Sequence, residues 1–117
     1  MTGLKWSSAE KKIARRAFDA ALNRECTAMM AMLKKLAASA SKPEDIWAIH
    51  DSLTEQRKAI DTKYDYRYSQ LVFVFARLLR EKWIEEQDLE GLGEEKLQAI
   101  RLLAFGWFFL AGLSMHK

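Results

Sequence analysis

The stretch that decides the fold of this chain reads Trp47-Ala48-Ile49-His50-Asp51-Ser52-Leu53-Thr54-Glu55-Gln56-Arg57. At about 100° per residue, a helix brings its apolar members and those just outside it onto one stripe: Ile46, Ile49, Leu53, Ile60 and Tyr64. Polar and aromatic groups flank this stripe: Trp47, His50, Asp51, Thr54 and Arg57. Trp and Arg are enriched among binding hot spots, so the pattern predicts a binding face. The alternative is an ordinary amphipathic helix with solvated charges.

A first long helix is predicted before this stretch. The run Ser7-Ser8-Ala9-Glu10 has the pattern of a capping box, which predicts a helix from Ser8 to Ala38. Its apolar residues recur at spacings of 4, 7, 4 and 3, which approach a heptad: Phe18, Leu22, Met29, Leu33 and Leu36. We therefore expect a helical partner along this face.

A break follows, and a second long helix carries the binding face. Pro43 lies in the break, and Ser41 with Glu44 predicts a second capping box. This helix should end near Thr62. The residues alone leave open whether the chain bends or continues between Asp61 and Asp65.

The last third predicts short helices. The segment 71–75 has a strand-like composition, but helix formers follow it, so a helix is favoured. A helical turn is expected between Glu85 and Gly93, and a last helix from Glu94. The prediction is an all-α fold with two long helices and a small helical head, formed as a homodimer. Residues 1–117 form one domain, with 1–64 as the dimerisation part and 65–117 as the head and an apolar tail.

The tail from Leu102 to Met115 has Ser114 as its polar residue. Roughly 14 residues are too few for a helix to span a hydrocarbon core of about 30 Å. We therefore expect the tail to be buried in a dimer or packed on the body. A position in a membrane interface is the alternative that three adjacent aromatic residues support, although a strong polar face is lacking: Trp107, Phe108 and Phe109.

Composition points to a single helical domain in a reducing compartment. The chain has 117 residues, half of them apolar, which suffices for one core. Cys26 is the single cysteine, so an intramolecular disulfide is excluded. It lies among methionines, and we expect it to be buried and inert. The opening residues lack a signal-peptide pattern, so the expected location is cytoplasmic.

The chemistry of catalysis is not apparent in the sequence. His50 and Asp51 form the one acid–base candidate, but consecutive side chains on a helix diverge by about 100°, so we do not expect them to orient each other. A nearby nucleophile, a Gly-rich phosphate loop and metal-ligand spacing are all missing. We therefore predict a protein that is not an enzyme, with no catalytic, cofactor-binding or metal-binding residues.

A basic cluster raises nucleic-acid binding as a rival function. It consists of Lys11, Lys12, Arg15 and Arg16. Acidic residues on the same helix dilute its field, and aromatic residues do not interleave with it in the sequence. The net charge is only +3, which is too small to imply a nucleic-acid partner. We predict that the protein does not bind nucleic acid.

The spacing from Trp47 to Leu79 resembles the fluorescence recovery protein family of cyanobacteria. It has the form W-x-x-H-D-x-L-x-x-x-R-x-x-I-D-x-K-Y-D-x-R-x-S, followed by F-V-F-A-x-L-L. The resemblance implies an all-helical, non-enzymatic homodimer that binds the photoactivated orange carotenoid protein. Such a protein speeds the return to the orange form and so ends the quenching of phycobilisome fluorescence. The implied place is the cytoplasm, with the thylakoid surface as an alternative.

The resemblance also assigns residues to two surfaces. The protein-interaction and dimer face comprises Trp47, His50, Asp51, Thr54, Arg57, Ile49, Leu53 and Ile60. The client contact on the head comprises Phe73, Lys96 and Arg101. The sequence departs from the family at Ser52, where a Phe is usual, and at Ala99, where a basic residue is expected. A homologue that serves another protein client, or a membrane surface, is therefore the alternative.

Overall fold

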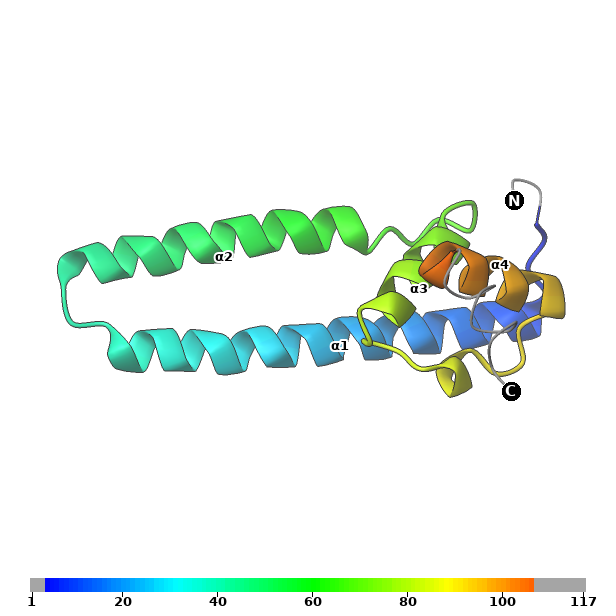
Figure 1. The fold of residues 1–117 in the computed structure, drawn as a ribbon, viewed down its shortest axis with the longest axis horizontal. Coiled ribbons are helices and arrows are strands. Elements are labelled where there is room, and N and C mark those ends of the chain that lie inside the picture. The colour runs from blue at the N-terminus through cyan, green and yellow to red at the C-terminus, as the bar shows by residue number, and fades with distance from the viewer. Residues whose placement is uncertain (1–3, 107–117) are drawn as a thin grey trace.

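The computed structural model of the protein describes residues 4–106, and over this range the chain is helical without strands. The elements in chain order are α1 (Ser8–Ser39), α2 (Pro43–Lys63), α3 (Leu71–Arg80), the 3-10 helix η1 (Glu86–Leu89) and α4 (Glu94–Phe105) (Figure 1). The predicted all-α class is confirmed, and each predicted helix is present. The tail beyond residue 106 lies outside the described residues.

The first capping box forms as predicted, and the second does not. Ser7 Oγ accepts a hydrogen bond from the Glu10 amide at 3.1 Å, and Glu10 accepts one from the Ser7 amide at 3.0 Å. At α2 the N-cap is Lys42. The Asp45 carboxylate accepts from the Ser41 and Lys42 amides at 2.8 and 3.0 Å. The predicted Ser41–Glu44 pair was therefore wrong, because the carboxylate that reaches back to the open amides is Asp45.

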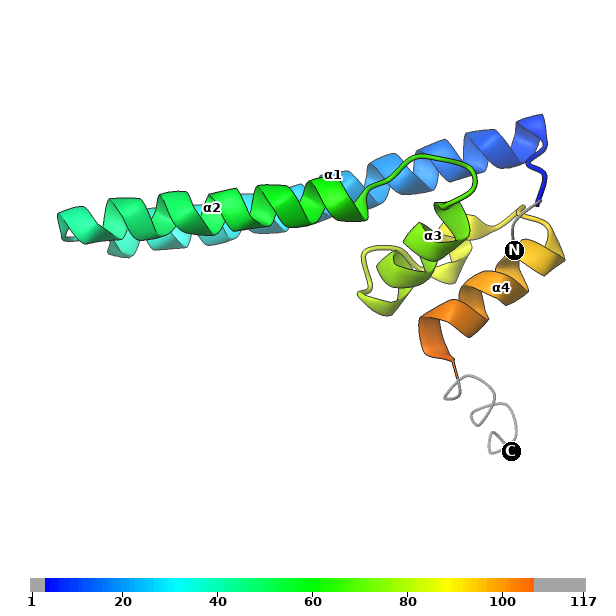
Figure 2. The same ribbon diagram turned by 90° about the horizontal axis from the view of Figure 1, so that it is seen from above.

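The head consists of α3, η1, α4 and residues 8–21 of α1. Its core draws on all of these elements and buries Ala14, Ala17, Phe18, Ala21, Leu71, Val72, Val74, Phe75, Ala76, Leu78, Leu79, Ile84, Leu89, Leu92, Ile100 and Ala104. Three small alanines on one face of α1 let the other helices approach closely. Figure 2 shows α3 and α4 on one side of α1. The head therefore includes the first half of α1, although our sequence division began it at residue 65.

The stalk consists of residues 22–63, which are the second half of α1 and the whole of α2. The two helices run antiparallel away from the head, and the molecule is 53 Å long. Helix α2 ends at Lys63 and the chain then turns through residues 64–70, which resolves the question that the sequence left open. None of the described core residues comes from the stalk. Within residues 4–106, no helix is both long and apolar enough to cross a membrane.

Candidate protein-interaction surface

The outer face of α2 presents the aromatic and polar residues that the sequence singled out. Trp47 is 64% exposed, and its ring stands edge-on to the His50 ring with centroids 6.2 Å apart. Thr54 Oγ1 donates to the His50 carbonyl oxygen at 3.0 Å. His50 Nδ1 lies 3.3 Å from Asp51 Oδ1. We did not expect these two side chains to orient each other, yet they are in contact, because both lie in open solvent and their rotamers can turn toward each other.

Arg57 extends this face by one further turn toward the head. Its Nε donates to Asp61 Oδ2 at 3.1 Å, in the i, i+4 arrangement of a helix surface. Both side chains are largely exposed, so solvent screens the pair and it adds little stability. The pair still orients the guanidinium along the helix, where an incoming carboxylate could form a bidentate contact with it.

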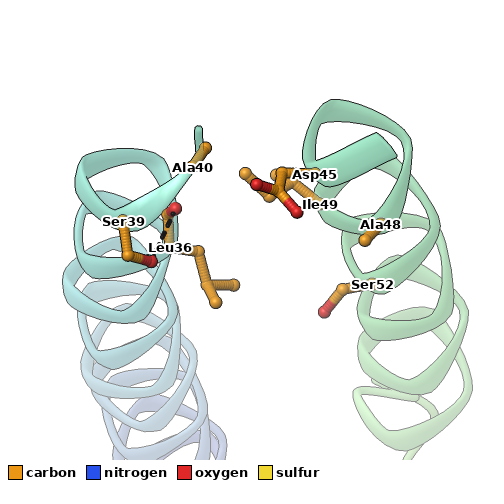
Figure 3. A pocket seen from close by; sticks show the side chains of 7 residues that line it. All are labelled: Leu36, Ser39, Ala40, Asp45, Ala48, Ile49 and Ser52. Atoms are coloured by element: carbon orange, nitrogen blue, oxygen red, sulfur yellow. Dashed lines mark hydrogen bonds between the residues drawn. The ribbon is translucent and has the colours of Figure 1, made fainter. Parts of the chain in front are cut away.

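The apolar stripe of α2 divides between two surroundings. Ile49 and Ile60 are half-buried, whereas Ile46 is 60% exposed and Leu53 is also exposed. Toward the end of the hairpin, the helices leave a cavity of about 270 Å³. It is lined by Leu36, Ser39, Ala40, Asp45, Ala48, Ile49 and Ser52. Figure 3 shows Leu36 and Ile49 reaching into the space between the helices. Both stalk helices thus present apolar side chains that the single chain leaves uncovered.

A second surface lies where the stalk meets the head. Phe73 is 45% exposed, although its neighbours on α3 belong to the core. It lines a groove of about 180 Å³ together with Thr62, Lys63, Asp65, Gln70, Val74 and Arg77. An aromatic ring beside a half-exposed guanidinium offers a partner both apolar contact and charge. The structure therefore presents the Phe73 ring at the surface, where a partner can reach it.

Lys96 is not available to a partner. The residue is 4% exposed, and its ammonium donates to the Lys5 carbonyl oxygen at 2.5 Å and to Glu10 Oε1 at 3.2 Å. Glu10 Oε2 also accepts from the Gly93 amide at 2.7 Å. Lys96 therefore joins α4 to the start of α1 inside the head. Its assignment as a client contact is corrected, because a buried and fully engaged ammonium cannot reach a partner.

The same network shifts the ionisation of Glu10. Burial alone would raise its pKa. The hydrogen bonds from the Ser7 and Gly93 amides and the contact with Lys96 outweigh burial, and they lower the pKa to about 2. Glu10 is therefore ionised in the folded head at any pH above this value.

Arg101 is also largely engaged within the head. It pairs with Glu86 at 2.8 Å through Nη2 and with Glu94 at 3.5 Å through Nη1. These contacts connect α4 to η1 and raise the pKa of the guanidinium, chiefly through the hydrogen bond to Glu86. The side chain retains a partly exposed edge, so of the three predicted head contacts Phe73 is the most open.

The basic cluster of α1 has aromatic neighbours in the folded protein, although aromatic residues do not interleave with it in the sequence. The Arg15 guanidinium lies 3.6 Å from the centroid of the Tyr66 ring and pairs with Asp19. Lys11 lies 5.1 Å from the Tyr68 ring. The rings come from the linker after α2, far away in the sequence. Two of the four cations, Lys11 and Arg15, therefore have contacts within the protein.

Cys26 is exposed on α1, so the expectation of burial was wrong. It lies in the stalk, where the single chain has no core to bury it. Among residues 4–106, no group of three or more His, Cys, Asp and Glu side chains is placed to hold a metal ion.

One cluster was missed by sequence reasoning. From the sequence, Lys63 received no role and Tyr64 was placed on the apolar stripe, whereas the structure joins both to Glu25 on α1. The partners are 38 and 39 positions apart in the chain. Local periodicity cannot reveal such a contact. The one sequence signal that could have suggested this contact is a lysine at the end of an amphipathic helix, next to a tyrosine.

The fold and these surfaces define an all-helical protein that presents aromatic, apolar and charged side chains on open helix faces. A family model described as "Photoprotection regulator fluorescence recovery protein" matches residues 6–104. The chain belongs to the fluorescence recovery protein family, which the sequence motif had indicated.

Individual relatives agree with this assignment. The fluorescence recovery protein of Synechocystis sp. PCC 6803 is 37% identical over 99 residues, which cover 85% of this chain and 91% of that protein. The solved structure of the Fremyella diplosiphon protein is 42% identical, with a TM-score of 0.81, and covers 86% of this chain and 98% of that one. The Synechocystis structure gives a TM-score of 0.82 at 37% identity over the same shares.

Proposed function

We propose that this protein binds the photoactivated orange carotenoid protein and accelerates its return to the orange form, thereby ending the quenching of phycobilisome fluorescence. The match to a photoprotection regulator over residues 6–104 carries the proposal. The exposed Trp47 and Phe73 support it, because they keep the family pattern at the surface. In this role the protein acts by binding in the cytoplasm, without catalysing a covalent reaction.

A symmetric homodimer is part of the proposal. The stalk leaves Ile46 and Leu53 exposed and a cavity open between its helices. Exposed apolar patches of this kind mark surfaces that pack against another molecule. In a two-fold dimer the same patch of each chain covers the other, so one exposed stripe suffices. A light-scattering mass of two chains at micromolar concentration is expected, and the mass of one chain would exclude the dimer.

The client would meet two surfaces. On the stalk, Trp47 would supply buried contact area, His50 a hydrogen bond, and Asp51 and Arg57 charge-assisted contacts to the client or across the dimer. On the head, Phe73 would supply an apolar anchor. Truncation of one hot-spot aromatic commonly costs more than about 2 kcal/mol, or roughly thirtyfold in affinity.

The direct test is the recovery kinetics of the photoactivated client in darkness, followed by its red-to-orange absorbance change. We expect acceleration by the wild-type protein, a large loss with Trp47→Ala or Phe73→Ala, and little change with Lys58→Ala. Lys58 is a matched control because it lies exposed on the same helix as Trp47. No acceleration at stoichiometric excess would reject the client and favour another protein client.

A further inference from the structure

A buried ionic cluster joins three helices where the stalk meets the head. The Lys63 ammonium lies 2.6 Å from Glu25 Oε2 on α1 and 2.7 Å from Glu81 Oε1 at the end of α3. The other oxygens of the two carboxylates are also engaged. The Tyr64 hydroxyl donates to Glu25 Oε1 at 2.8 Å, and Arg77 Nε donates to Glu81 Oε2 at 2.9 Å. We name Lys63, Glu25 and Glu81 the junction cluster.

Together with Arg77, which pairs with Glu81, the junction cluster is balanced in charge. Lys63 and Arg77 supply two positive charges, and Glu25 and Glu81 supply two negative charges. Lys63 is 8% exposed and Glu25 is mostly buried. Removing one member of such a group leaves an uncompensated charge in a poorly solvated place, which is costly. The contacts with Lys63 and Arg77 accordingly lower the pKa of Glu81, against the opposing effect of burial.

Apart from the junction cluster, α2 is held to the chain by half-buried side chains such as Ile49 and Ile60, and by Tyr64, whose ring packs edge-on against Phe18 with centroids 5.3 Å apart. Within residues 4–106, the residue that α2 buries is Lys63, and the described core draws nothing from this helix. The short connection at 40–42 holds its other end. A helix held at its two ends can still rotate about its axis or swing sideways unless one end is locked. Among the contacts described for α2, the junction cluster is the one that ties its end by ion pairs to α1 and to the end of α3 at once.

We infer that Lys63 is a positioning residue that fixes α2 relative to the head, and so sets the placement of the Trp47 face relative to Phe73. Lys63 and Phe73 line the same groove, so the lock lies directly beside the head surface. Rotation of α2 about its axis would turn the Trp47 face away from a client that holds Phe73. The use of both surfaces by one client rests on the function proposed above.

Distances between two spin labels test the lock without any client. One label is placed at Ala59→Cys on α2 and the other at Glu95→Cys on α4, in a Cys26→Ser background. Labelled protein is mixed with excess unlabelled protein, so that only distances within one chain are measured. We expect a narrow distribution for the otherwise unchanged protein, and one at least twofold broader after Lys63→Met.

Three further variants make the test specific. Lys58→Met is the same substitution at an exposed site of α2 and should leave the distribution narrow. Ile100→Val weakens the head core away from the cluster, and it should also leave the distribution narrow. Glu81→Gln keeps the shape of a half-exposed member of the cluster and should also broaden the distribution. If urea unfolding shows that Lys63→Met is not cooperatively folded, the distances of Glu81→Gln decide the test. An unchanged distribution in both cluster variants would overturn the inference.

The second readout is the concentration of protein that gives half-maximal acceleration of client recovery. Lys63→Met should raise it at least fivefold, whereas Ile100→Val should not, because general destabilisation does not move the two surfaces apart. A broadened distribution with unchanged recovery would overturn the positioning role. If the wild-type protein fails to accelerate recovery, the proposed function fails, and the distances alone decide whether the cluster locks α2.

Discussion

The head buries Phe75, Leu78 and Ile100 completely, whereas the stalk leaves Ile46 and Trp47 more than half exposed. Both regions are helical and both contain large apolar side chains. The head closes a core from elements that are far apart in the chain, and the stalk is a hairpin that has only one layer. A hairpin of two helices has no second layer against which to bury its apolar side chains completely. The difference indicates that the described head encloses a core within one chain, whereas the stalk leaves apolar side chains exposed, and these are the side chains that the proposed dimer would cover.

The largest effect should come from truncation inside the head. Phe75→Ala removes a fully buried ring and should lower the free energy of unfolding by about 3–5 kcal/mol. Phe73→Ala, two positions away on the same helix, removes a half-exposed ring and should cost less than about 1 kcal/mol. Urea unfolding measures both variants. Equal losses would contradict the burial pattern of α3.

Acid should weaken the head through Glu10. Its pKa is about 2 in the folded state against 4.5 as the ordinary value. Stabilisation is therefore complete above about pH 5 and is lost as the pH falls toward 2. The contribution is about 3 kcal/mol. Glu10→Gln should lower stability at pH 7 and flatten the pH dependence, while the exposed Glu95→Gln should change neither. A Glu10→Gln profile parallel to that of the wild type would refute this assignment.

A smaller effect is expected for the stalk, and it should appear in assembly. Leu53→Ala removes an exposed leucine from the proposed dimer seam and should weaken dimerisation by about 2 kcal/mol, or roughly thirtyfold. Leu102→Ala is the matched control, because this leucine is similarly exposed but lies on the head. Light scattering over a dilution series separates the two. Equal effects would place the dimer seam elsewhere.

The smallest effect is expected on the outer face of α2. Asp61→Asn removes the ion-pair partner of Arg57, and both side chains are exposed. The free energy of unfolding should change by less than about 0.5 kcal/mol. Chemical denaturation at low and high salt measures the change. If the free energy of unfolding falls by more than about 1 kcal/mol, the assembled protein buries this ion pair, and this part of the stalk is not open to solvent.

Local patterns were sufficient to predict the helices. The Ser7 capping box and the helix formers that follow segment 71–75 depend on neighbours within one or two turns. For the same reason the all-α class followed from the sequence. The cap of α2 was misplaced by one residue. A sequence pattern does not distinguish the neighbouring carboxylates of Glu44 and Asp45, and in the fold it is Asp45 that accepts hydrogen bonds from the Ser41 and Lys42 amides.

Contacts between distant segments could not be predicted in this way. Lys96 looked like a surface cation, and only the folded head brings Glu10 to it from 86 positions away. The Tyr66 ring against Arg15 and the junction at Lys63 have the same origin. Burial of a charged side chain depends on which distant partner arrives. A single sequence does not specify that partner.

The hydrogen bond from the Gly93 amide to Glu10 closes a loop of 83 positions. Closing a loop of this length is slow, because the chain loses conformational entropy before the contacts of the core begin to stabilise it. The contact between Lys63 and Glu25 joins residues only 38 positions apart. We therefore expect it to form before the Gly93–Glu10 contact, because the shorter loop costs less chain entropy. Once it has formed, a shorter segment remains to be brought back to α1, so the stalk would speed the closure of the head.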